Sequence, residues 1–203
     1  MPMSSNRSVD YFDVQFRHQV DTGDLQLNPF EEAALPHLRG RLLDFGCGMG
    51  NLAVAAAKRG CSVVALDASN AAISHLQNRA KRESLDIDAM QADLRSFEVS
   101  EDFDTIVSIG LLMFFDRPTA YRSLAMLQAR VREGGTAVVN VMIEGSTYMA
   151  MFEPEAHCLF PPRALEERFA DWKILYSALS EFPAPDNSVK SFATVIAQKK
   201  VAQ

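Results

Sequence analysis

The sequence predicts an α/β fold: a single doubly wound, mostly parallel seven-stranded sheet that ends in a C-terminal antiparallel hairpin. From residue 41 onward, strand-like apolar runs alternate with segments of helical periodicity, the pattern of a parallel sheet covered by helices on both faces. A glycine-rich turn follows the first of these strands. The link between the last two strands is too short to hold a crossover helix, so these strands are expected to run antiparallel.

Four strands and two helices make up the first part of this alternation. The strands are expected at residues 41–45, 62–66, 86–91 and 103–112. A helix over residues 51–59 can end at Gly60, because glycine readily takes the left-handed conformation that closes helices. Ser69 can cap the second helix, since its hydroxyl can accept a hydrogen bond from the unpaired N–H groups of the first turn.

The second part of the alternation ends in two paired strands. A helix that opens at Asp116 is expected to end near Arg132, and Gly134 then turns the chain into a strand over residues 136–143. The last two strands are expected at residues 172–182 and 191–198, on either side of a link at 183–187. In such a sheet, ligands bind at the carboxyl ends of the parallel strands, near the point where the strand order reverses.

Residues 1–40 contain no clear strand. Apolar residues such as Tyr11 and Phe16 lie among polar ones there, which favours a helical segment laid over the edge of the sheet. We therefore expect an N-terminal helical cap over residues 1–40 and one main domain over residues 41–203. At 203 residues the chain is long enough for one well-buried core and too short for two full domains.

Composition and charge argue against several classes of protein. With 48% hydrophobic and 23% charged residues, the sequence is that of an ordinary globular protein. No apolar run approaches the roughly 20 residues that span a bilayer, so no membrane partner is expected. The first residues also lack the apolar segment of a secretory signal. The net charge of −6 argues against a nucleic-acid partner, whose phosphates favour a basic face.

The three cysteines, Cys47, Cys61 and Cys158, are odd in number and show no CxxC spacing. This pattern argues against a disulfide framework and against a zinc site, so no metal is expected and a cytoplasmic location is favoured. Cys47 lies inside the glycine-rich turn, but no histidine is close to it in sequence. We therefore expect it to fill space rather than to act as a nucleophile.

The glycine-rich turn is the most informative segment. An apolar strand ends with Asp44, and Gly46, Gly48 and Gly50 follow at alternate positions. Glycine allows positive φ and removes the Cβ that would keep a ligand away, while the next helix points unpaired N–H groups at the same place. A dinucleotide fingerprint would need a third glycine at position 51, which is Asn51. The turn therefore favours a ligand with a charged amino-acid end.

Asp67, Asp93 and Ile109 fall at the ends of the next three strands and should meet the turn in one crevice. Asp67, about twenty residues after the turn, can accept hydrogen bonds from both hydroxyls of an adenosine ribose. Asp93 can face the adenine amino group. A ribose, an adenine and a zwitterionic tail together describe S-adenosylmethionine, which we expect as the cofactor.

Four segments carry a resemblance to a known family: LLDFGCGMGN, VVALDAS, MQADLRSF and FDTIVSIGLLMFF. They resemble the corresponding segments of class I S-adenosylmethionine-dependent methyltransferases. Residues 111–115, 158–172 and 192–200, with the aromatic pair Tyr11-Phe12, are similar to the tellurite-resistance methyltransferases. The resemblance implies a Rossmann-like fold, S-adenosylmethionine as methyl donor and a small-molecule acceptor, with S-adenosylhomocysteine as product.

The residues and the resemblance together predict two neighbouring sites. The donor site is expected to contain Asp44, Gly46, Cys47, Gly48, Asn51, Asp67, Ala68, Ala92, Asp93, Leu94, Ile109 and Arg17. The acceptor pocket is expected to contain Tyr11, His18, Met113 and Phe114. No catalytic residue is assigned.

Methyl transfer from a sulfonium is an in-line displacement, for which the protein mainly aligns the reactants and excludes water. A soft anionic acceptor, such as a chalcogen oxyanion or a thiolate, needs no general base. A phenol or an amine would need one, and His18, His157 and Glu144 are the candidates. Two alternatives stay open: an NAD-type dinucleotide-dependent oxidoreductase, and a non-catalytic module that only binds S-adenosylmethionine.

Overall fold

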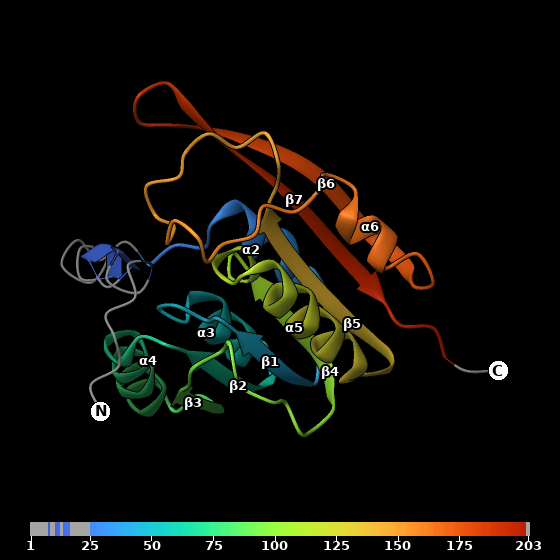
Figure 1. Ribbon diagram of the computed structural model, residues 1–203. Helices are drawn as coiled ribbons and strands as arrows, with labels where there is room; N and C mark the ends of the chain where they lie inside the picture. Colours follow the sequence, from blue (N-terminus) through green and yellow to red (C-terminus); the bar gives the residue numbers. More distant parts are fainter. Residues whose placement is uncertain (1–7, 9–10, 13, 17–24, 202–203) are drawn as a thin grey trace.

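The computed structural model contains a seven-stranded sheet (Figure 1), and its description covers residues 8, 11, 12, 14–16 and 25–201. The strands are β1 (Arg41–Phe45), β2 (Ser62–Asp67), β3 (Ile87–Gln91), β4 (Phe103–Ile109), β5 (Val131–Met142), β6 (Lys173–Ala184) and β7 (Ser188–Gln198). Their order is β3-β2-β1-β4-β5-β7-β6, in which β1 to β5 pair in parallel and β7 runs antiparallel to β5 and β6. The predicted α/β fold, with a mostly parallel sheet and an antiparallel C-terminal hairpin, is confirmed.

The hairpin of β6 and β7 closes through a tight turn at residues 185–187. Asp186 and Asn187 have φ values of 57° and 54°, the left-handed backbone that suits short hairpin turns. Ser188 N donates a hydrogen bond to Pro185 O at 3.1 Å. Because β7 returns between β5 and β6, its side chains belong to the body of the sheet and not to its edge.

Helices cover both faces of the sheet. They are α2 (Pro29–Ala34), α3 (Asn51–Lys58), α4 (Asn70–Glu83), α5 (Arg117–Ala129) and α6 (Ala164–Arg168), with the short 3₁₀ helices η1 (Leu35–His37) and η2 (Leu112–Phe114). Leu42 packs with side chains of α2, α3 and α4, whereas Leu43 packs with those of α5 and α6. Consecutive residues of a strand point to opposite faces, so these two leucines anchor the two layers. Figure 1 shows α5 in front of β4 and β5.

β4 is shorter than expected. It ends at Ile109 and not at residue 112, because the chain turns at Gly110, with φ 68°, and continues as η2. The apolar run that favoured a longer strand is still buried, since the η2 residues Leu112, Met113 and Phe114 are each less than 9% exposed. The apolar sequence of this segment therefore indicated that it is buried, but not that it is a β-strand.

β5 begins earlier than expected. α5 ends at Ala129 and β5 starts at Val131, whereas the helix was predicted to end near Arg132 and the strand to start at residue 136. The strand runs through Gly134 and Gly135 as a bulge, and its register against β4 shifts there. A Cβ on Gly135 would lie 2.8 Å from the Arg132 carbonyl oxygen, so the bulge requires glycine.

Ahead of β1, residues 8, 11, 12 and 14–16 are helical, and α2 and η1 follow. Asn28 caps α2: its side-chain oxygen accepts hydrogen bonds from Phe30 N and Glu31 N at 3.0 Å, and Glu31 Oε2 accepts one from Asn28 N at 2.8 Å. The division of the chain at residue 40 stays a prediction. Within the described ranges no helix has both the length and the apolar character needed to cross a membrane.

Candidate active site

Hydrogen bonds to the end of β2 fix the glycine-rich turn between β1 and α3. Gly46 N and Cys47 N each donate to Leu66 O at 2.9 Å. Gly50, the N-cap of α3, has φ 72°, and a Cβ there would lie 2.5 Å from side-chain carbons of Leu76. The turn can take this path only with glycine at position 50, because any Cβ there would collide with the Leu76 side chain of α4.

Asp67 ties the glycine-rich turn to the start of α4. Its Oδ2 accepts a hydrogen bond from Gly48 N at 2.8 Å, and its Oδ1 accepts one from Ser69 N at 2.9 Å. An ionised carboxylate offers about four lone-pair positions, so Asp67 retains the capacity to accept ligand hydroxyls. The residue therefore both shapes the turn and presents oxygens beside it.

Asp44 is buried at the start of the turn, and the half-buried Glu31 lies near enough for its charge to act on Asp44. Burial is the main cause that raises the pKa of Asp44 to about 8, and the charges of Glu31 and Asp67 act in the same direction. Burial also raises the pKa of Glu31, against the opposing effect of the hydrogen bond from Asn28 N. A cation bound beside this pair would favour the charged form of both carboxyl groups.

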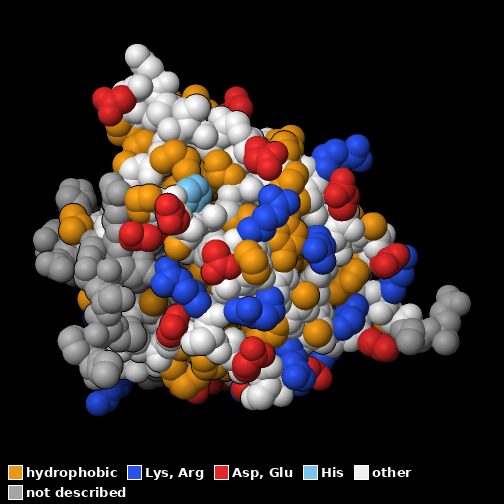
Figure 2. Space-filling view, viewed as in Figure 1, with side chains coloured by type: hydrophobic (Ala, Val, Ile, Leu, Met, Phe, Trp, Pro, Cys, Tyr) orange, Lys and Arg blue, Asp and Glu red, His pale blue; other side chains and the backbone are white. Residues whose placement is uncertain are grey.

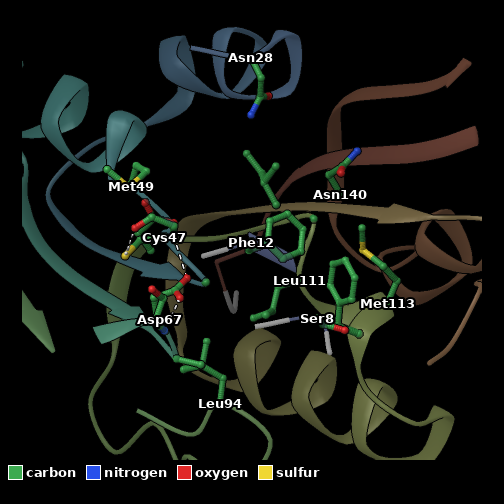
Figure 3. A pocket seen from close by; sticks show the side chains of 18 of the residues that line it. Ser8, Phe12, Asn28, Cys47, Met49, Asp67, Leu94, Leu111, Met113 and Asn140 are labelled. Carbon is green, nitrogen blue, oxygen red and sulfur yellow. Dashed lines mark hydrogen bonds between the residues drawn. The ribbon is translucent and has the colours of Figure 1, made fainter. Parts of the chain in front are cut away.

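These groups line a cavity of about 740 Å³, the size of a small-molecule site. Figure 3 shows side chains around this cavity from the turn (Cys47 and Met49), from the N-cap of α2 (Asn28) and from β5 (Asn140). The predicted residues on its wall are Asp44, Gly46, Cys47, Gly48, Asn51, Asp67, Ala68, Asp93, Leu94, Ile109, Met113 and Phe114. The structure thus brings most of the expected residues together, while the role of each stays a prediction.

Two of the expected residues that the structure describes, Ala92 and Tyr11, are not on this wall. Ala92 lies behind it and donates its N–H to Asp67 O at 2.9 Å. Tyr11 is turned to Tyr148, with 3.2 Å between the two hydroxyl oxygens, and burial with this contact raises its pKa to about 12. Arg17 and His18 lie outside the described residues.

The other candidates for a general base or nucleophile are also accounted for. His157 stacks on Phe152, with ring centroids 5.0 Å apart, and its Nδ1 lies 3.1 Å from Glu153 O. Neither His157 nor Glu144 lines the cavity. Cys47 does, but burial raises the pKa of its thiol well above the usual value, so the thiol stays protonated.

The cavity wall includes residues that the sequence did not single out. Asn28 and Glu31 reach it from α2, Asn140 from β5, and Lys190 and Phe192 from β7. The only sequence signal among them is Asn140, a polar residue inside the apolar run VVNVM. The others could not be found, because the packing of α2 on the sheet and the return of β7 beside β5 are properties of the tertiary fold.

One side of the cavity is aromatic. We call Phe12, Phe30, Phe114 and Phe192 the aromatic wall. Phe12 meets Phe114 edge to face with centroids 5.2 Å apart, and Phe30 lies 5.0 Å from Phe192. Such contacts hold the rings in fixed positions and exclude water from the space they border.

Comparison with known proteins agrees with this geometry. Residues 42–135, which include the turn, Asp67 and Asp93, match the family model described as a methyltransferase domain. A probable S-adenosyl-L-methionine-dependent methyltransferase, TehB of Haemophilus influenzae, is 26% identical over 206 residues, covering 96% of this chain and 68% of the relative. Residues 42–135 thus match a methyltransferase domain, and the chain as a whole is similar to an S-adenosylmethionine-dependent methyltransferase.

Solved structures show the fold of this methyltransferase domain in other proteins. The crystal structure of TehB from Haemophilus influenzae superposes with a TM-score of 0.72 at 23% identity, covering 84% of this chain and 61% of that chain. A geranyl diphosphate methyltransferase in complex with SAM superposes with a TM-score of 0.63 at 17% identity, covering 83% of this chain and 84% of that chain. The methyltransferase domain described here thus spans about two thirds of the length of TehB.

Proposed function

We propose that this chain transfers a methyl group from S-adenosylmethionine to a soft anionic nucleophile of a small molecule, a thiolate or a chalcogen oxyanion. The observation that carries the proposal is the chemistry of the cavity wall. Among its described residues there is no histidine and no tyrosine, and the carboxylates of Glu31, Asp67 and Asp93 accept hydrogen bonds from backbone N–H groups. An acceptor that attacks as an anion needs no base, whereas a phenol or an amine would.

The turn fits the methionine end of the donor. Asn51 and Leu52 bring the N-terminus of α3 to the cavity, where it can receive a carboxylate. Asp44 and Glu31 can receive an ammonium, whose positive charge would offset the burial and the neighbouring carboxylates that raise the pKa of Asp44. Asp67 can accept the ribose hydroxyls, and Asp93 with Leu94 borders the expected position of the adenine. When bound, S-adenosylmethionine supplies an electrophilic methyl group on a sulfonium.

On the acceptor side, the protein aligns and shields. The aromatic wall borders the space next to the turn and excludes water, and positioning of this kind can supply about 7–11 kcal/mol of a barrier. Lys190 brings a positive charge to the same wall, held over the Tyr148 ring at 4.5 Å. No described carboxylate forms an ion pair with it, so the ammonium can attract an anionic acceptor.

The donor part of the proposal is tested by titrating S-adenosylhomocysteine calorimetrically. Asp67→Ala and Asp67→Asn should weaken binding by about tenfold or more, because each removes a charged acceptor of the ribose hydroxyls. The matched control is Asp88→Ala, on an exposed position of β3, which should bind as the unmodified protein does. Binding of a nicotinamide dinucleotide with no heat from S-adenosylhomocysteine would contradict the proposal and favour an oxidoreductase.

The acceptor part is tested with radiolabelled donor and a panel of tellurite, selenite, small thiols and catechols. Methyl transfer to a thiol or chalcogen, weakened by Lys190→Gln, is expected. Transfer to catechols alone would contradict a soft anionic acceptor. Intact donor binding with no transfer at all would favour a module that only binds S-adenosylmethionine.

We also propose a small acceptor, rather than a nucleic acid, and a cytoplasmic location. On the face shown in Figure 2, basic and acidic side chains are mixed and do not gather in one basic patch. The three cysteines are free and buried, which suits a reducing compartment. Residues 1–40 are proposed as the cap over the site, in line with Phe12 and Glu31 on the cavity wall.

A further inference from the structure

We propose that Asn140 selects the methyl acceptor: its side-chain carbonyl accepts a hydrogen bond from an O–H or N–H group of an organic molecule whose apolar body lies against the aromatic wall. This inference rests on the proposed methyl transfer and narrows it to organic acceptors. It concerns a residue in the middle of the sheet, outside the set expected to hold the donor.

Asn140 is held rigidly between two strands. It pairs with Ile109 of β4 on one side and with Thr194 of β7 on the other, and it is 0% exposed. Its Nδ2 donates to Thr194 Oγ1 at 2.9 Å and lies 3.5 Å from Ala193 O. The carbonyl oxygen of Ala193 can only accept, so the nitrogen end of the amide must face it. The position of Oδ1 is fixed as a result.

Oδ1 of Asn140 is buried and accepts no hydrogen bond from any residue that the structure describes. A buried carbonyl without a donor destabilises a protein, and the large majority of such groups have partners. Val138 and Met142, two residues away on the same face of β5, are both buried in apolar clusters. An apolar side chain would therefore suit position 140 if only packing mattered.

The unpartnered amide borders the cavity. Asn140 lies on the wall with Met113 and Phe192, and Figure 3 shows it on the same cavity as Phe12. A ligand in this space can supply the donor that the protein lacks. A fully ionised oxyanion offers only acceptors to Oδ1 and would lose its hydration against aromatic rings and methionine. An organic molecule with an apolar body and one O–H or N–H group satisfies both surfaces.

The test compares the binding of phenol and toluene, which have nearly the same shape but differ in the hydroxyl. Both are titrated into the full chain saturated with S-adenosylhomocysteine. We expect phenol to bind about tenfold more tightly than toluene, because toluene leaves Oδ1 without a donor. Equal affinity for the two would overturn the proposal.

Variants of Asn140 locate the effect. In Asn140→Leu the ratio of the two affinities should fall to about one, whereas Asn140→Asp keeps a buried oxygen acceptor and should retain a preference for phenol. Ser108→Ala is the matched control: Ser108 Oγ is also buried and unpartnered among the described residues, but it does not line the cavity. A preference for phenol that survives in Asn140→Leu, with unchanged S-adenosylhomocysteine binding, would overturn the proposal. If Asn140→Leu does not fold, the ratio of phenol to toluene affinity in the unmodified protein and in Asn140→Asp still tests the proposal.

Turnover separates this inference from the proposed function. With radiolabelled donor, 4-mercaptophenol should be methylated on sulfur with a kcat/KM about tenfold above that of 4-methylbenzenethiol. Sulfur of the thiolate forms the new bond to the methyl carbon as the sulfonium bond breaks, leaving neutral S-adenosylhomocysteine. Methylation of thiols or tellurite without any preference for phenol would overturn the role of Asn140 alone. A binding preference for phenol without methyl transfer to any thiol or chalcogen would contradict the proposed function alone.

Discussion

Donor binding should depend on pH through Asp44. In the free protein the pKa of this carboxyl is raised to about 8 by burial, Glu31 and Asp67, so at pH 6 it is almost fully protonated. The ammonium of the donor's methionine end, placed beside Asp44, favours the carboxylate. Binding at pH 6 must therefore release about one proton, and the affinity must carry the free-energy cost of removing it.

The magnitude follows from the pKa. Each pH unit below about 8 costs about 1.4 kcal/mol, a factor of ten in the dissociation constant, as long as Asp44 is ionised in the complex. The Kd of S-adenosylhomocysteine should therefore fall about tenfold per pH unit between pH 6 and 7.5. Above that range the ligand's own amino group begins to titrate, with an ordinary pKa of about 7.7–8.0, and the dependence should flatten.

The assay is calorimetric titration at several pH values, repeated in buffers of different ionisation enthalpy to count the released protons. Asn at position 44 cannot titrate, so Asp44→Asn should bind with a Kd that changes little from pH 6 to 7.5 and without proton release. A flat profile in the unmodified protein, or the same slope in Asp44→Asn, would refute the electrostatic reasoning. Asp88→Ala should keep the full slope, because that residue is exposed on β3.

Three further predictions concern the free protein. The folded protein holds the Asp44 proton up to about pH 8, whereas the unfolded chain releases it near its usual pKa of 3.8. This difference makes the free energy of unfolding fall as pH rises between those values. Urea unfolding at several pH values should therefore show a weaker pH dependence for Asp44→Asn than for the unmodified protein. Gly50→Ala should lose about 2–4 kcal/mol in urea unfolding, from left-handed strain and a contact at 2.5 Å, while Gly60→Ala, also at positive φ but with nothing within 4 Å, should lose only the strain, about 1–2 kcal/mol; equal losses would contradict the steric argument. Asn28→Ala removes the capping box of α2 and should lower the free energy of unfolding by about 0.5–2 kcal/mol. It should also weaken donor binding, because the capping box no longer holds Glu31 in place; an unchanged donor affinity at constant pH would disprove this.

The meeting of the residues proposed to hold the donor could be predicted from the sequence, because their signals are local. Asp44, Asp67 and Asp93 follow strands whose apolar runs are clear, and parallel strands place their carboxyl ends at one edge. Chain segments of a few residues therefore determine which side chains meet. The same locality explains the correct antiparallel hairpin, since a short link leaves no other connection.

The residues on the proposed acceptor side of the cavity could not be predicted in the same way. The pairing of β7 with β5 in one particular register brings together Asn140, Lys190 and Phe192. The sequence of neither strand predicts that register. Asn28 and Glu31 reach the cavity through the packing of α2 on the sheet. The start of β5 was missed for a related reason: Gly134 looked like a turn, whereas pairing with β4 and β7 keeps it within a bulged strand.

The position of β7 also has a consequence for how the site comes into being. During synthesis, the glycine-rich turn and the ends of β1, β2 and β4 emerge well before residues 188–198, so the proposed donor site can form while Lys190 and Phe192 of the proposed acceptor side are still missing. β7 can join β5 only at the end, with β6 as its outer neighbour. Fraying of the sheet from that edge would remove Lys190 and Phe192 first. If these residues bind the acceptor as proposed, acceptor recognition forms last during folding and is lost first on partial unfolding.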